Sequence, residues 1–396
     1  EEGPPAVVVD EDSKDDIDPD TLEAIRRRVA SEVGSIQPYR LRLAPDYIGD
    51  VGSIYFFSGY GFGLMNQIAF SDLLGDHHVF VAFNLYQSIE DSDIQVSYYY
   101  LKKRLDYAVG AFQYKNYLNS RVSSIGETFQ DYRLFTERNY GVSGLVSYPV
   151  STFTRLDLEL EAFVSEREFF GVYELQDGIY VYSVPEKSTR YVLQPALSLV
   201  HDSAYWGQFG PVIGSRWLAS VSQAVSVSGD MVDRFSAYYD FRKYQPLYYR
   251  NYLVFRSMGA ASTGDDGRVF FLGGPMTMRG YDYLQFSGSR MLLCTLEYRY
   301  PLLDAVVFGW PGRWAITNIG GSFFVDSGSV WGRNRHIEAL PQVEPRTLRD
   351  LEFYSDFGFG FHLRFGYIVL NFEYGWPTDF SATGDPMFHF YLGPLF

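Results

Sequence analysis

The sequence predicts an all-β fold, a 16-stranded antiparallel transmembrane β-barrel, and three observations predict it. Hydrophobic residues make up 46% of the 396 residues, yet the mean hydropathy is only −0.13, so apolar and polar residues are interleaved. No apolar run reaches the length of about 18 residues that a transmembrane helix needs, whereas barrel strands need only about 9–11 residues of alternating polarity. Short turns alternate with longer loops, and single-chain bacterial barrels have even strand numbers.

The N-terminal part differs from the rest of the chain, and we expect residues 1–37 to be a linker before a barrel that spans 38–396. Residues 1–20 are acidic and contain proline, which is typical of a disordered linker. Residues 20–33 could form one short helix with Asp20 as its N-cap, and a solvated connector is the alternative. The chain begins EEGPP, so either a signal peptide has been removed or the sequence is a piece of a longer protein.

The barrel strands are predicted from alternation of side chains. Residues 155–164 (RLDLELEAFV) place leucines on one face and Asp157, Glu159 and Glu161 on the other. The same pattern holds in 294–300, 359–365 and 368–374. We expect strands to begin near residues 53, 62, 77, 93, 104, 137, 154, 168, 189, 210, 231, 248, 291, 316, 354, 366 and 386, with longer loops at 115–135, 260–290 and 332–352. This gives 15–17 strands, depending on whether 53–58 and 168–183 count as strands.

A large soluble β-sandwich is the alternative fold, because water and a barrel lumen both accept polar side chains. Aromatic residues make up 18% of the chain and lie at many strand ends, as they do in the interfacial girdles of membrane barrels. The outward faces are apolar over many successive strands, with no second layer to cover them. Both observations favour the membrane barrel.

Composition and motifs exclude several other classes of protein. The net charge of −15 argues against a nucleic-acid partner, and the single cysteine, Cys294, excludes an intramolecular disulfide. The segment GVSGL (141–145) has Leu145 where a nucleophile elbow needs glycine. His77 and His78 are adjacent, so they point to opposite faces of a strand and cannot share a metal. We therefore expect no enzyme activity, no cofactor and no metal site.

The C-terminal segment MFHFYLGPLF carries the first specific motif. Phe388, Phe390 and Leu392 alternate along it, and the last residue is Phe396. This resembles the C-terminal β-signal of bacterial outer-membrane proteins.

Three further segments resemble one family. FFLGGPMTMRGY (270–281) followed by LEYRYPL (296–302), SFFVDSGSVW (322–331) and the hairpin at 356–377 are similar to the outer-membrane protein assembly-factor superfamily, which includes BamA-like and TamA-like surface-antigen barrels. The resemblance covers 270–396 well, whereas 38–269 fit only as generic barrel strands. Members normally carry periplasmic POTRA domains, and 1–37 are too short for one.

The resemblance implies both the site and the function. It implies a bacterial outer-membrane barrel with an inward-folded extracellular loop, which aids insertion or translocation of other polypeptides through a lateral seam and a loop-plugged lumen. The implied partners are outer-membrane lipid, client outer-membrane or secreted polypeptides and, as further candidates, periplasmic or lipoprotein subunits. The alternative is a passive channel or a membrane anchor for a missing N-terminal periplasmic or surface module.

The tip of that loop is predicted at Arg279, Gly280 and Tyr281. A guanidinium in a narrow lumen needs a carboxylate partner, and strand periodicity points Glu297 and Asp326 inward. We therefore expect Arg279 to pair with one or both acids and to latch the loop to the wall. Gly273, Gly274 and Gly280 are expected to supply the tight or left-handed backbone of the fold-back. A solvated arginine among ordinary turn glycines is the alternative.

The barrel seam is predicted to be weak. Pro394 cannot donate a hydrogen bond to a ladder, and Gly393 weakens the strand beside it. Gly61 and Gly63 lie in a glycine-rich segment near the other end of the barrel. This suggests a gate that opens toward lipid; alternatively, Pro394 only ends a strand at the membrane edge.

Overall fold

The computed structural model divides the chain into two compact units, Glu1–Arg42 and Leu43–Phe396. It describes residues 19–32, 39–48, 53–57, 61–85, 92–122, 131–175, 178–207, 210–229, 231–310, 312–332, 336–337, 342–349, 351–365, 368–392 and 395. The first unit contains the helix α1 (Pro19–Glu32), in which Arg27 and Glu23 form an exposed ion pair one turn apart at 2.8 Å. Of the two alternatives for this segment, the helix is therefore the one that forms. Among the described residues, no helix is both long and apolar enough to cross a membrane.

The second unit is built of strands. They are β1 (Ala44–Ile48), β2 (Ser53–Phe57), β3 (Gly61–Ser71), β4 (His77–Leu85), β5 (Asp93–Tyr100), β6 (Asp106–Val122), β7 (Asp131–Ser151), β8 (Thr154–Leu175), β9 (Gly178–Asp202), β10 (Tyr205–Trp206), β11 (Pro211–Gly229), β12 (Asp233–Pro246), β13 (Tyr252–Gly264), β14 (Phe270–Leu272), β15 (Phe286–Gly288), β16 (Arg290–Phe308), β17 (Trp314–Trp331), β18 (His336–Ile337), β19 (Arg346–Leu348), β20 (Leu351–Phe365), β21 (Ile368–Thr378) and β22 (Met387–Leu392).

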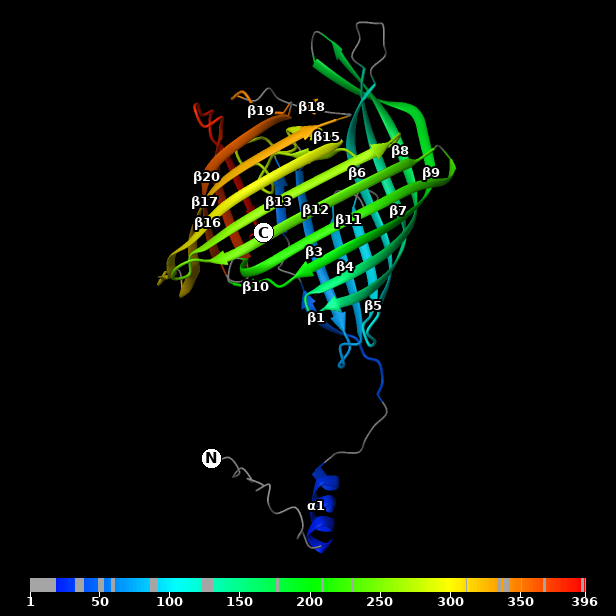
Figure 1. Cartoon of the computed structure of the whole chain (residues 1–396), viewed down its shortest axis with the longest axis vertical. Helices are drawn as coiled ribbons and strands as arrows, with labels where there is room; N and C mark the ends of the chain where they lie inside the picture. The colour runs from blue at the N-terminus through cyan, green and yellow to red at the C-terminus, as the bar shows by residue number, and fades with distance from the viewer. Residues whose placement is uncertain are drawn as a thin grey trace. The chain divides into compact units, whose positions relative to one another are not determined.

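The large strands form one antiparallel ladder that curls into a barrel (Figure 1). In the described part of the chain it runs through β3, β4, β5, β6, β7, β8, β9, β11, β12, β13, β16, β17, β20, β21 and β22. Strands β1 and β2 both pair with β3 and share one further position, whereas the short β10 and β19 only extend β11 and β20. The described ladder thus has sixteen positions, and the predicted all-β antiparallel barrel is confirmed.

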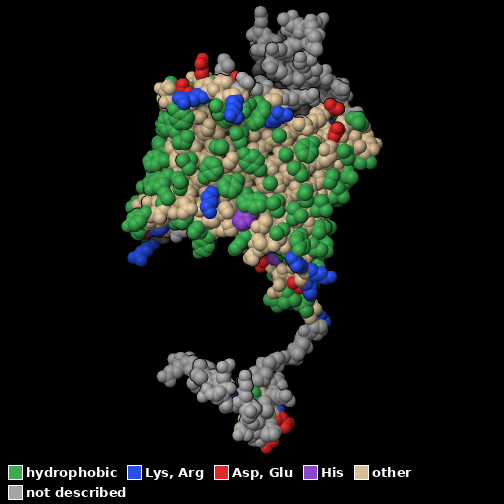
Figure 2. Space-filling view, in the orientation of Figure 1, with side chains coloured by type: hydrophobic (Ala, Val, Ile, Leu, Met, Phe, Trp, Pro, Cys, Tyr) green, Lys and Arg blue, Asp and Glu red, His purple; other side chains and the backbone are tan. Residues whose placement is uncertain are grey.

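The two faces of the ladder differ as the alternation predicts. On β8, Leu158 is 56% exposed, whereas its neighbour Asp157 is 8% exposed. On β20, Phe361 is 37% exposed and His362 is 1% exposed. Figure 2 shows hydrophobic side chains scattered over the body of the outer face, with charged side chains mostly near its ends. The apolar face therefore points outward, and the polar face lines the lumen.

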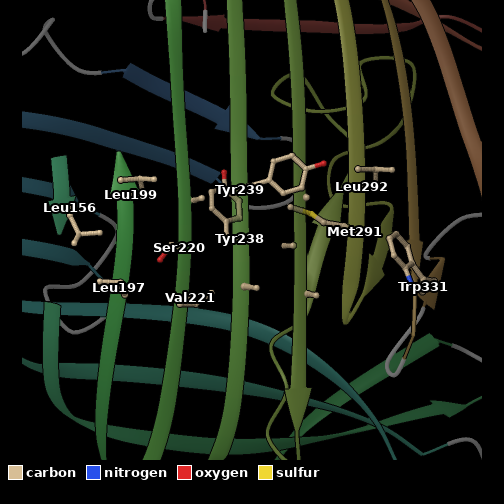
Figure 3. A pocket seen from close by; sticks show the side chains of 15 residues that line it. Leu156, Leu197, Leu199, Ser220, Val221, Tyr238, Tyr239, Met291, Leu292 and Trp331 are labelled. Carbon is tan, nitrogen blue, oxygen red and sulfur yellow. The ribbon is translucent and has the colours of Figure 1, made fainter. Parts of the chain in front are cut away.

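The outer face carries a shallow apolar hollow of about 630 Å³ across β8, β9, β11, β12, β13 and β16 (Figure 3). Leu156, Leu197 and Leu199 border it on one side. Gly259 lies within it, and a Cβ at this position would come within 2.4 Å of Cε1 of Tyr239. The glycine is therefore needed to accommodate the tyrosine ring on this face.

The structure decides the two strands that the sequence leaves open and corrects one loop. Residues 53–57 form β2, whereas no separate strand starts near residue 168, because β8 continues through this position to Leu175 and β9 begins already at Gly178. The expected loop at 115–135 is shorter, since β6 extends to Val122. In the barrel, residues near position 168 pair across strands: Arg167 on β8, for example, donates to Glu137 on β7 at 2.6 Å.

Candidate functional site

The segment between β13 and β16, residues 265–289, turns back onto the barrel wall, and we call it the inner loop. Its strands β14 and β15 pair with each other, and β15 also pairs with β18. Gly273 and Gly274 have φ values of 115° and 94°, a backbone conformation that favours glycine. The loop contributes four side chains to a buried apolar cluster with residues of β13, β16, β17 and β20: Leu272, Met278, Tyr281 and Phe286.

Arg279 lies at the centre of the inner loop and is 1% exposed. Its Nε and Nη2 donate to the two carboxylate oxygens of Asp326 at 2.9 and 3.0 Å. Its Nη1 donates to Glu297 at 2.8 Å and to Glu373 at 3.3 Å. The guanidinium carbon also lies 3.5 Å from the centre of the Phe324 ring. The bidentate bond to Asp326 uses the planar fork that lysine lacks.

The electrostatic surroundings of Arg279 keep it charged. Burial alone disfavours the charged guanidinium, but the negative charges of Asp326, Glu373 and Glu297 more than offset it and hold the pKa of Arg279 well above its usual value. Arg299 donates to Glu297 at 2.6 Å and supplies a second positive charge. The cluster is thus an ion network that links the loop to three wall strands, β16, β17 and β21.

The residues after Arg279 bring the loop backbone against the wall. A Cβ on Gly280 would lie 2.5 Å from Cβ of Asp356 and 3.0 Å from the backbone nitrogen of Pro377. Gly280 is therefore required for close approach, and it does not have the positive φ of Gly273 and Gly274. The Tyr281 hydroxyl donates to the backbone oxygen of Ser355 at 3.0 Å, and burial raises the pKa of this hydroxyl.

The last described strand, β22, also contacts the loop tip. Nε2 of His389 lies 2.9 Å from the backbone oxygen of Arg279, so the histidine is the donor. The Tyr391 hydroxyl donates to Glu373 at 3.2 Å, on the same carboxylate oxygen that accepts from Arg279.

A second ion cluster holds the beginning of the inner loop. Asp266 accepts ion pairs from three arginines of the wall, Arg167 on β8 at 2.6 Å, Arg190 on β9 at 3.1 Å and Arg234 on β12 at 3.3 Å. The loop is thus bound at Asp266 to the middle strands and at Arg279 to the C-terminal strands.

The predicted seam residues are distributed differently from the expectation. Gly61 and Gly63 lie in β3 and pair with Phe57 and Tyr55 of β2, one position in from the edge. The strand beside β22 is β2, since Cα atoms of the two strands come within 8 Å of each other. No ladder joins β2 to β22 among the described residues. Gly393 and Pro394 lie outside the described residues.

The predicted C-terminal signal lies on β22. Phe388 and Phe390 are exposed on its outer face, at 49% and 47%. Leu392 ends the strand, and Phe396 lies outside the described residues.

Sequence reasoning missed four charged or polar partners of the inner loop, Glu373, His389, Tyr391 and Asp356, and one residue within the loop that binds the wall, Asp266. For Glu373 the signal was present, because 368–374 alternate and place it on the polar face. Asp266 gave no signal, since it lies in a segment without periodicity. Its partners lie on β8, β9 and β12, and only the folding of the inner loop back onto these strands brings them to Asp266.

The described residues contain no group of three or more His, Cys, Asp or Glu side chains that could hold a metal ion. His77 and His78 contact different partners, the Tyr98 hydroxyl at 2.6 Å and the backbone oxygen of Gly75 at 3.1 Å. The main feature of the described site is the inner loop, which ion pairs hold against the barrel wall.

The comparisons with known proteins agree with this architecture. The model of the Omp85 superfamily domain matches residues 102–396. The chain belongs to the Omp85 superfamily. The resemblance to outer-membrane assembly factors is thereby confirmed, and the protein is a β-barrel of the bacterial outer membrane. No curated protein sequence matches the chain.

Solved structures show the same fold at low sequence identity. BamA from Haemophilus ducreyi lacking POTRA domains 1–3 is similar with a TM-score of 0.57 and 15% identity, covering 94% of this chain and 78% of that one. CdiB from Escherichia coli is similar with a TM-score of 0.51 and 11% identity, covering 90% of this chain and 67% of that one. Omp85 proteins are barrels for polypeptide insertion or secretion that work with client polypeptides and partner subunits.

Proposed function

We propose that this protein inserts or translocates other polypeptides at the outer membrane, with the inner loop as a plug and the β2–β22 edge as a lateral exit. The observation that carries the proposal is the buried Arg279, which a loop delivers from within the barrel to Asp326, Glu297 and Glu373. A loop held in this way fills the lumen and leaves a passing polypeptide no free path until the ion pairs break.

The energetics of Arg279 suit a plug that is stable and still releasable. Removing one partner of a buried ion pair costs about 3–5 kcal/mol, because the other charge is left without compensation. A loop that moves as a unit would instead carry its cation into water, which compensates the charge. The plug would thus resist partial opening and favour two discrete positions.

The proposed lateral exit rests on the neighbouring strands β2 and β22. Their Cα atoms come within 8 Å, and no ladder joins them in the described part of the chain. Strand edges with free backbone groups are templates for pairing with another chain. A client strand could therefore be received here without any covalent chemistry, and we propose that the protein is no enzyme.

The proposed partners follow from this mechanism. They are outer-membrane lipid on the apolar face, unfolded client polypeptides at the seam, and periplasmic or lipoprotein subunits that deliver the clients. We further propose that residues 1–37 act as a linker to such a module and that the barrel spans 38–396.

The experiment is reconstitution of the whole chain in vesicles of phosphatidylethanolamine and phosphatidylglycerol. An unfolded outer-membrane barrel of about eight strands, added in urea, serves as the client. We expect it to fold into these vesicles faster than into empty ones, and we expect small, flickering conductance in planar bilayers. Large, steady openings without accelerated client folding would show a passive channel or anchor instead.

A further inference from the structure

We propose that the last strand and the plug form one mechanical unit: His389 and Tyr391 of β22 hold the tip of the inner loop, so that β22 leaves the barrel edge only when the tip is released. This rests on the proposed function and adds a regulatory link between its two parts. His389 and Tyr391 are positioning residues in this scheme.

The first contact is direct. His389 Nε2 donates to the backbone oxygen of Arg279 at 2.9 Å. This bond depends only on where the backbone of the loop tip lies, because its acceptor is a main-chain oxygen. It would form with any side chain at position 279.

The second contact passes through a shared carboxylate. Tyr391 donates to Oε1 of Glu373 at 3.2 Å, and Arg279 donates to the same oxygen at 3.3 Å. Tyr391 is 5% exposed and Glu373 is 0% exposed, so water cannot readily replace the tyrosine donor or the carboxylate acceptor. If β22 moved away, Glu373 would lose one donor and Arg279 would lose its bond to the strand.

The backbone of the loop tip also abuts the pair that β22 forms with β21. Gly375 pairs with Met387 of β22, and a Cβ on Gly375 would lie 2.5 Å from the backbone oxygen of Arg279 and 2.6 Å from the nitrogen of Gly280. Two positions further along the ladder, Glu373 and His389 are direct cross-strand partners, and both contact Arg279. The tip therefore rests on the β21–β22 hairpin near its first described pair.

The opposite face of β22 provides matched controls. Phe388 and Phe390 flank His389 in the strand and point outward, away from the loop. A substitution there perturbs the same strand without touching the tip. Any effect confined to His389 and Tyr391 would thus report the link and not strand stability alone.

A link of this kind must act in both directions, because a coupling free energy is shared by the two sites. Weakening the contacts of β22 with the loop tip should make displacement of the plug more frequent, and displacing the plug should make separation of β22 from the barrel edge more frequent. The test needs one measurement for each element.

The plug is measured by conductance in planar bilayers. We expect large openings to be about tenfold more frequent in a His389→Leu/Tyr391→Phe double variant, since lost buried hydrogen bonds shift such an equilibrium by about this factor. His389→Gln keeps an N–H donor and should stay near the wild type, and Phe390→Leu should equal the wild type. If the double variant shows large openings as rarely as Phe390→Leu does, the proposed link is wrong.

The seam is measured by the distance between two nitroxides, one at Phe388→Cys on β22 and one at Val96→Cys on β5, with Cys294→Ser to remove the single native cysteine. The strands between them place the labels about 20 Å apart, from a strand spacing of about 4.8 Å. We expect Arg279→Lys to broaden this distance distribution. A distribution equal to that of the wild type, in a variant whose conductance shows a released plug, would overturn the link.

Failure of the link and failure of the proposed function give different results. If the wild type accelerates client folding while neither measurement shows coupling, only the link is wrong. If the wild type shows no acceleration of client folding, the proposed function fails whatever the distances show.

Discussion

At the scale of single residues, the site depends on the chemistry of one guanidinium. Arg279 makes two bonds to Asp326 and one each to Glu297 and Glu373, and it lies over the ring of Phe324. A lysine ammonium can replace the charge but not the fork, the planar stacking or the span between carboxylates. Position 279 therefore requires arginine mainly for the geometry of its hydrogen bonds, and less for its charge.

Arg279→Lys should destabilise the folded barrel by about 2–3 kcal/mol, because bidentate charge-assisted bonds are lost while the acids stay buried. The measurement is urea unfolding in detergent micelles, followed by tryptophan fluorescence. Arg268→Lys is the control, since Arg268 is an exposed arginine near the start of the same loop. Equal midpoints for the two variants would mean that Arg279 is not held as tightly as its contacts suggest.

The acids around Arg279 should differ in their effect. Asp326 and Asp356 are direct cross-strand partners and both are fully buried, so only one of the two carboxyls can readily carry a charge, and Arg279 binds that of Asp326. Asp356→Asn exchanges an uncharged carboxyl for an uncharged amide of similar shape and should leave stability nearly unchanged. Asp326→Asn removes the bidentate partner and should lower stability by about 3 kcal/mol. The same urea titration compares them, and similar losses for both variants would contradict this assignment.

At the scale of elements, the inner loop is bound at two separate points of the wall. Its beginning is held through Asp266 by Arg167, Arg190 and Arg234, and its tip is held at Arg279. The middle and C-terminal strands are thereby joined across the lumen by one segment. If the inner loop acts as the proposed plug, its release requires both contacts to break, unless the loop unfolds between them.

Asp266→Asn should therefore increase the frequency of large openings in planar bilayers. The three arginines lose their shared anion and repel one another, which weakens the hold on the beginning of the loop by a few kcal/mol. The neighbouring Asp265 is exposed, and Asp265→Asn is a matched control that we expect to behave like the wild type. Equal opening frequencies in the two variants would show that the beginning of the loop does not restrain it.

The elements also show what could be predicted from the sequence. Period-2 alternation identified most strands and the inward direction of Glu297 and Asp326, because side-chain direction in a strand is a local property. Strand ends were less certain: the sequence suggests a strand start near residue 168, but pairs across β7 and β8 keep Glu166–Glu168 in one continuous strand. Contacts such as His389 with Arg279, 110 positions apart, depend on the folding of the inner loop onto β21 and β22 and have no local signal.

At the scale of the whole molecule, the described ladder brings both ends of the barrel chain together, since β22 lies beside β2. The inner loop lies on the inner wall of the last strands and is bound to the middle ones. An event at the barrel edge can therefore reach the lumen through β22 and β21, without any change in the remaining strands.

The two compact units give a last prediction for the whole molecule. The ladder, both ion clusters and the apolar cluster lie within Leu43–Phe396. Deleting residues 1–37 should thus leave the barrel folded, with unchanged heat-modifiable mobility on gels and an unchanged urea midpoint. Client folding in vesicles should also persist, because the proposed exit and plug are retained. A truncated chain that folds normally but no longer accelerates client folding would assign the N-terminal segment a part in client handling, and a chain that fails to fold would contradict the independence of the barrel unit.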